Sequence, residues 1–107
     1  MEYNLAEKLA IVKMVDSVIY ADGIVHSGEI GFMGELMKIM DFNSNLILQA
    51  RNIANSQSLL LLCNMTNKKK VALADLLEKV ALSDGFKHEK ELELLLRIFA
   101  VIGIDRG

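Results

Sequence analysis

The sequence predicts an all-α fold of about six helices in a single domain that spans residues 1–107. Three observations support this. Apolar residues recur with the helical period of about 3.6 residues. Proline is absent, and Leu, Ala, Met, Glu and Lys, which favour helices, dominate the composition. A pattern of helix, turn and helix also occurs twice. A chain of this length buries roughly two-thirds of its unfolded surface, so one core suffices.

The chain contains an internal repeat. Shifting the sequence by 62 positions aligns a first copy, residues 9–42, with a second copy, residues 71–104. The identical positions are Ala10, Val18, Asp22, Gly23, His26 and Glu29 in the first copy, and Ala72, Val80, Asp84, Gly85, His88 and Glu91 in the second. Because identities at turns and caps mark one structural unit used twice, we expect two pseudo-symmetric helix-turn-helix repeats.

The first helix of the first copy is expected to begin just before that copy, with a well-formed N-terminal cap. Asn4 can cap this helix, and Glu7, three residues later, can bond back to the cap N–H. Gly23 supplies the residue of positive φ that commonly ends a helix. A second helix is expected over 27–40, and its apolar residues are predicted to fill the core: Phe32, Met33, Met37 and Met40, followed by Phe42. For the three methionines a partner groove is the alternative.

Helix 27–40 also carries Gly28, Gly31 and Gly34. Each glycine lowers helix stability by roughly 1 kcal/mol relative to alanine. Two explanations stay open. Another helix, a ligand or a second subunit approaches this backbone closely, or the helix is weak at its start.

Two connecting helices are expected within 43–66. Asn43 or Ser44 can cap the first, which runs to residue 54, and the second covers 57–63. Cys63 lies in an apolar stretch with no adjoining basic residue to activate its thiol, so we predict a buried side chain rather than a nucleophile.

The second copy is expected to form helices 67–82 and 89–102. In the first of these we interpret Lys68, Asp75, Glu78 and Lys79 as one narrow polar stripe, which predicts a central helix. In the second, Glu93 and Arg97 are spaced for an i,i+4 pair.

Composition argues against several classes of function. The net charge is −2, and the one basic run, Lys68-Lys69-Lys70, has no aromatic neighbour, so we expect a solvated surface and no nucleic-acid partner. No apolar run approaches the roughly 20 residues of a membrane span, and no secretory signal is visible, which favours a cytoplasmic protein. Since no nucleophile motif or phosphate-binding loop occurs, we expect no enzymatic activity.

Two short motifs carry a family resemblance. Tyr20-Ala21-Asp22-Gly23-Ile24-Val25 with Glu29, and Leu82-Ser83-Asp84-Gly85-Phe86 with Glu91, resemble the paired Ala-Asp-Gly, hydrophobic and Glu signatures of the TerB (tellurite resistance) family. The resemblance covers nearly the whole chain. It implies a compact helical fold with pseudo-twofold symmetry, a role in tellurite resistance or stress responses, and either a metal-chelating acidic site or a scaffolding role.

The segment from Asp22 to Glu29 also matches the second half of an EF-hand loop. The earlier ligand positions of such a loop would be Val18 and Tyr20 here, and neither offers a carboxylate. A calcium loop of that type is therefore not expected.

Two interpretations of the turn residues remain. In the first, His26 and His88 cap helices, Glu29 and Glu91 complete the caps, and the aspartates bond turn amides. In the second, the same side chains bind a divalent metal ion: Asp22, His26, Glu29, Asp84, His88 and Glu91. Mixed nitrogen and oxygen donors suit zinc, manganese or iron better than calcium alone, provided that the two turns converge.

Two functional hypotheses follow. The first is a non-enzymatic TerB-like domain that binds another protein, in a tellurite or metal stress response. The second is a metal-binding protein that uses the two Asp-Gly turns.

Overall fold

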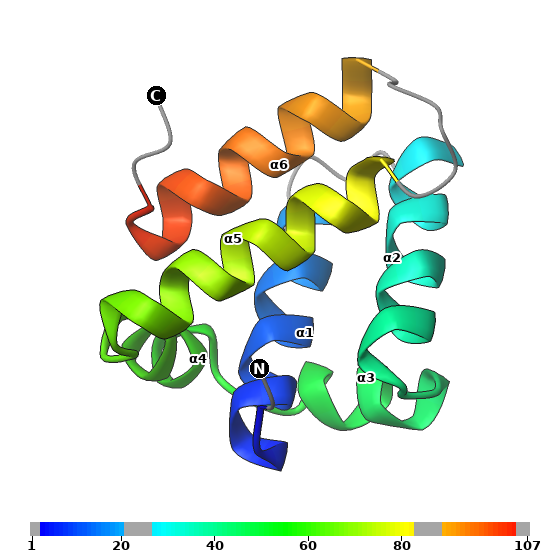
Figure 1. Ribbon diagram of the computed structural model, residues 1–107. Coiled ribbons are helices and arrows are strands. Elements are labelled where there is room, and N and C mark those ends of the chain that lie inside the picture. The colour runs from blue at the N-terminus through cyan, green and yellow to red at the C-terminus, as the bar shows by residue number, and fades with distance from the viewer. Residues whose placement is uncertain (1–2, 21–26, 83–88, 105–107) are drawn as a thin grey trace.

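The computed structural model describes residues 3–20, 27–82 and 89–104. Six α-helices follow one another in this part of the chain: α1 (Leu5–Ile19), α2 (Ser27–Met40), α3 (Ser44–Arg51), α4 (Asn55–Cys63), α5 (Asn67–Leu82) and α6 (Glu89–Ile102). No strand occurs among the described residues, so the predicted all-α class is confirmed. In Figure 1, α5 crosses in front of the upper end of α1, α6 lies above α5, and α2 stands beside them. None of these helices is long and apolar enough to cross a bilayer.

The start of α1 is the capping box that the sequence predicts. The Asn4 side chain accepts a hydrogen bond of 2.8 Å from the Glu7 N–H. In return, the Asn4 N–H donates to Glu7 Oε1 over 3.0 Å. Two N–H groups that lack helical partners are thereby satisfied.

The helix bounds recur at the offset of the sequence repeat. Adding 62 to the bounds of α2 gives those of α6, and α5 begins 62 residues after α1. The helix ends also match. Asp41 and Gly103, the residues that follow α2 and α6, both have positive φ, 57° and 75°. The next N–H groups close the same type of turn, from Phe42 to Met37 O (3.0 Å) and from Ile104 to Phe99 O (2.9 Å).

The first helix of each copy packs against the second helix of the other copy. α1 packs against α6, and α5 packs against α2. This is the arrangement that pseudo-twofold symmetry produces, and it supports the predicted repeat. Superposition of the complete copies stays a prediction.

The core is one cluster of apolar side chains from α1, α2, α4, α5 and α6. Its fully buried members include Ile11, Val15, Phe32, Leu36, Leu62, Leu73, Leu77 and Ile98. Met33 and Met40 are buried, and Met37 and Phe42 pack against the cluster. The methionines of α2 therefore fill gaps in the core, as predicted.

The helix at the centre is α1, not α5 as the sequence pattern predicts. α1 packs against α2, α3, α4 and α6, and nine of its residues are buried. α5 packs on α2 and α6 and leaves Val71 about half exposed. The charge pattern gave the wrong central helix because α1 contains the acidic residues Glu7 and Asp16. A sequence places such residues at the surface, but both are buried here beside basic partners.

Candidate functional site

The six residues predicted for the two turns fall outside the described part of the structure. Asp22, His26, Asp84 and His88 lie in segments that it does not describe. Glu29 and Glu91 lie in the first turns of α2 and α6, but their side chains are outside it as well. Both interpretations of the turns therefore stay predictions. The described residues contain no group of three His, Cys, Asp or Glu side chains able to hold a metal ion.

A cavity of about 260 Å³ opens where α1 ends, between α2 and α3. Its apolar lining consists of Ile19, Ile30, Met33, Met37 and Ile47, and its polar lining of Asp16, Tyr20 and Arg51. We call it the Arg51 groove. Tyr20 is the last described residue before the first Asp-Gly turn, so the groove adjoins one of the two motifs that carry the family resemblance.

An ion pair between the buried carboxylate of Asp16 and the half-exposed guanidinium of Arg51 forms the polar side of the Arg51 groove. Arg51 donates from Nε to Asp16 Oδ2 (3.1 Å) and from Nη2 to Asp16 Oδ1 (3.0 Å). The Asp16 side chain is 11% exposed and that of Arg51 is 46% exposed. These hydrogen bonds to Asp16, together with the negative charge of that carboxylate, raise the pKa of the Arg51 guanidinium. Such two-point pairing fixes the plane of the arginine and joins α3 to α1.

Arg51 also lies over the ring of Tyr20, 5.5 Å from the ring centre. This arrangement favours a cation–π contact. Sequence analysis did not identify Asp16 or Arg51, and it named Tyr20 only in connection with the first Asp-Gly motif. The one signal was Asp16, an acid on an otherwise apolar face of its helix.

The rim of the groove is apolar and open. Tyr20 and Ile30 are exposed although both are large. A Cβ atom added to Gly31 or Gly34 would meet no atom within 4 Å. Within the described chain, no other helix approaches these glycines closely, which removes one of the explanations considered for them. A ligand, a second subunit and a weak helix start remain.

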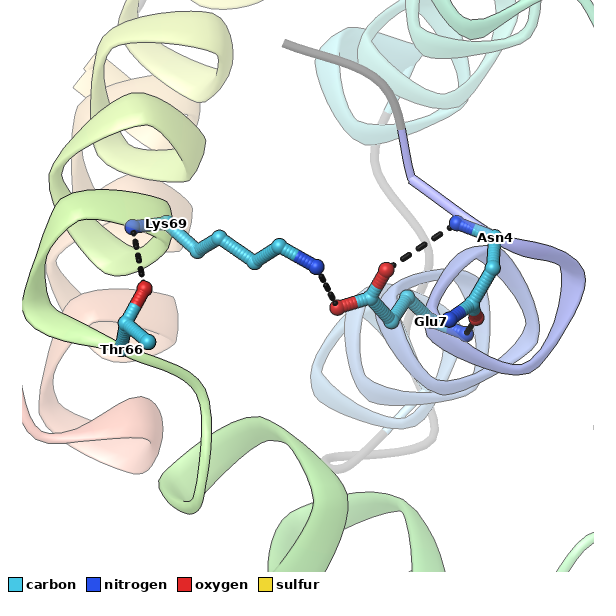
Figure 2. A network of polar contacts seen from close by, with 4 residues as sticks. All are labelled: Asn4, Glu7, Thr66 and Lys69. Carbon is cyan, nitrogen blue, oxygen red and sulfur yellow. Dashed lines mark hydrogen bonds and ion pairs between the residues drawn. The ribbon is translucent and has the colours of Figure 1, made fainter.

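A second polar cluster joins the starts of α1 and α5 (Figure 2). Lys69 Nζ donates to Glu7 Oε2 over 2.7 Å, and the Lys69 N–H donates to Thr66 Oγ1 over 3.2 Å. The hydrogen bond from Lys69, with that from the Asn4 N–H, lowers the pKa of Glu7. Lys69, the middle lysine of the basic run, is therefore paired with the buried carboxylate of Glu7, whereas the sequence predicts that the whole run is solvated.

Tyr3 lies close to this cluster and is buried. Its hydroxyl has no hydrogen-bond partner among the described residues. Burial and the negative charge of Glu7 raise the pKa of this phenol.

Cys63 is exposed, which corrects the prediction of a buried thiol. It is the last residue of α4, and the preceding residue, Leu62, is fully buried. Adjacent residues of a helix point about 100° apart. Leu62 thus fills the core position, and Cys63 shares the outer face with the exposed Leu60.

No protein-family model matches the chain, and no curated protein matches it. Among solved structures, the chain is similar to the crystal structure of a protein of unknown function from Porphyromonas gingivalis W83. The TM-score is 0.73 at 28% sequence identity, and the match covers 100% of this chain and 84% of that chain. The similarity supports the helical architecture over its whole length. It transfers no activity, because the function of that protein is itself unknown.

Proposed function

We propose that the chain is a non-enzymatic TerB-like domain that binds another protein through the Arg51 groove. The proposed setting is a cytoplasmic response to tellurite or metal stress. The paired Asp-Gly signatures support the family, and the helix bounds that recur at the repeat offset support two copies of one unit. The setting rests on the family resemblance alone.

The observation that carries protein binding is the composition of the Arg51 groove. Its floor contains Met33 and Met37, and its rim presents Tyr20, Ile30 and Arg51. Methionine, aromatic residues and arginine are enriched where proteins bind one another, and central anchors there fill apolar pockets. The bare backbone at Gly34 also allows a partner side chain to approach closely.

The test is affinity capture from the cell extract with matched variants. Ile30→Glu places a charge on the groove rim. Leu60→Glu is the control, because Leu60 is as exposed (64% against 62%) but lies on α4, away from the groove. We expect a partner that wild type and Leu60→Glu retain and that Ile30→Glu loses. Equal retention by both variants would contradict binding at this groove.

We propose metal binding at the two turns as the second candidate. Asp, His and Glu recur there at matched positions, and the helix ends that flank the turns support convergence. The start of α2, the end of α5 and the start of α6 lie toward the same upper end of Figure 1, and these three helices pack on one another.

Elemental analysis of the purified protein and calorimetric titration with zinc, manganese and calcium test this candidate. Metal binding would hold the turns together, so thermal melts with and without chelator should differ. The Asp22→Asn, Asp84→Asn double variant should lose affinity, since two ligand charges are removed. Lack of binding to wild type at micromolar metal would reject the metal role.

A further inference from the structure

Three cavities in the described part of the chain each carry one basic side chain. They are the Arg51 groove, a cavity of about 280 Å³ beside Lys69, and a cavity of about 250 Å³ beside Arg97. In the first two, a buried carboxylate neutralises the base: Asp16 pairs with Arg51 and Glu7 with Lys69. No acidic residue is among the described residues that line the third. The Arg97 cavity therefore differs from the others in its charge.

Arg97 is held in place without an acid from its cavity. Its Nη2 donates to the carbonyl oxygen of Val18 over 3.3 Å. That carbonyl lies in the last turn of α1, where helix carbonyls lack partners within the helix. The bond engages one N–H of a guanidinium that has five, so the group is oriented and keeps further donors. The i,i+4 pair of Glu93 and Arg97 stays a prediction.

The remaining lining combines apolar surface with hydrogen-bond donors. Met14, Val18, Leu59 and Val101 supply the apolar part, from α1, α4 and α6. Ser17 Oγ donates to Asn55 Oδ1 over 3.0 Å, which leaves the NH₂ group of Asn55 as a donor. The Ser58 hydroxyl already donates to the Asn55 carbonyl over 2.9 Å. Arg97 and Asn55 together favour a ligand group that accepts hydrogen bonds and carries negative charge.

We propose that the Arg97 cavity binds a small monocarboxylic acid with an apolar body. The carboxylate pairs with Arg97, because the planar guanidinium matches the two oxygens of a carboxylate. The hydrocarbon part packs on Met14, Leu59 and Val101. The volume is below the range of about 300 to 1,000 Å³ that is common for drug-sized ligands, so nucleotide-sized cofactors are too large. The acid is either free or the end of a peptide chain with an apolar last residue.

NMR titration of the isotope-labelled protein tests the proposal with octanoate as the probe. We expect saturable shifts at the amides of Val18, Asn55, Leu59 and Val101. Octanol lacks the charge and inorganic phosphate lacks the apolar body, so both should bind at least tenfold more weakly. N-acetyl-leucine and its amide distinguish the source. If N-acetyl-leucine binds more strongly than octanoate and its amide does not bind, the natural ligand is a chain terminus. If octanoate binds more strongly than N-acetyl-leucine, the ligand is a free acid.

Two variants separate specific binding from general attraction. Arg97→Gln should weaken octanoate binding at least tenfold and leave octanol unchanged. Lys38→Gln, which removes an exposed lysine on α2, should leave both unchanged. If Arg97→Gln disturbs the fold, Val101→Trp blocks the cavity from a partly exposed position instead. Undiminished octanoate binding in a folded Arg97→Gln or Val101→Trp variant would overturn the proposal. So would shifts spread over remote exposed residues such as Leu5.

Discussion

The ammonium nitrogen of Lys69 lies 2.7 Å from a carboxylate oxygen of Glu7, its counterpart 62 residues earlier in the chain. Their caps correspond too, since Asn4 caps α1 as Thr66 caps α5 (Figure 2). In a twofold arrangement, a residue contacts its own counterpart only near the axis. The contact therefore supports a pseudo-twofold axis between the starts of α1 and α5.

Lys69→Met should lower the free energy of unfolding at pH 7 by about 1 to 3 kcal/mol, because the carboxylate of Glu7 stays buried and loses a charged partner. Lys68→Met is the control, since Lys68 is the exposed neighbour. Urea unfolding measures both. An equally large loss of stability in Lys68→Met would mean that the overall positive charge of this segment, and not the pair with Glu7, is responsible.

The loss in Lys69→Met should also depend on pH. The pKa of Glu7 is lowered from its ordinary value of 4.5 in the folded state. The stability that this carboxylate contributes is therefore fully present above pH 4.5 and disappears as the pH falls through the lowered value. Wild type and Lys69→Met should converge in stability under acidic conditions, as urea unfolding at a series of pH values will show. A difference that stays constant to the lowest pH would contradict the assignment.

Arg51→Lys should loosen α3 locally. Lysine keeps the charge but not the two parallel hydrogen bonds to Asp16, so we expect a loss of about 1 kcal/mol, limited by the exposure of Arg51. Hydrogen exchange should accelerate at the amides of α3, including that of the buried Ala50, while amides of α5 such as Leu77 act as the internal control. Equal acceleration in both helices would show that the pair stabilises the fold as a whole.

The sequence predicted those features that depend on local interactions. The bounds 27–40, 67–82 and 89–102 are those of α2, α5 and α6, and the capping box at Asn4 is present. Caps, turns and helical periodicity act over a few residues, so a single sequence displays them. α3 and α4 deviate by two to three residues at one end each, because helix ends are defined less sharply than helix interiors.

The features that the sequence could not predict depend on contacts between distant segments. Asp16 meets Arg51 and Glu7 meets Lys69 only in the folded chain, and these pairs allow two acidic residues to be buried on the central helix α1. The exposure of Cys63 depends likewise on which side of α4 faces the core. The residues of the Arg51 groove come from three helices, and no motif marks them.

Gly31→Ala and Gly34→Ala should each raise the free energy of unfolding by up to about 1 kcal/mol, since alanine favours a helix and a new Cβ meets open space. Sedimentation should show unchanged association, and Gly34→Ala should weaken capture of a partner at the Arg51 groove. Weaker self-association in either variant would instead indicate that this face of α2 contacts a second copy.

The residues that follow α2 and α6 allow a test in which opposite substitutions are made at two equivalent positions. Asp41 and Gly103 hold equivalent positions after α2 and α6, and both have positive φ. A residue with a Cβ in this region costs about 1 to 2 kcal/mol relative to glycine, less for aspartate, whose side chain bonds locally. Asp41→Gly should therefore stabilise the protein by up to about 1 kcal/mol, and Gly103→Ala should destabilise it by about 1 kcal/mol. Urea unfolding measures both changes.

Asn52→Gly is the matched control, because Asn52 ends α3 with a negative φ of −85°. Glycine gains nothing at that position and adds freedom to the unfolded chain, so the variant should be less stable than wild type. If Asp41→Gly is destabilising to the same degree, the backbone at Asp41 does not share the conformation of Gly103, and the equivalence of the two helix ends is lost. Opposite signs at Asp41 and Gly103 would show that both helix ends share the left-handed backbone conformation that favours glycine.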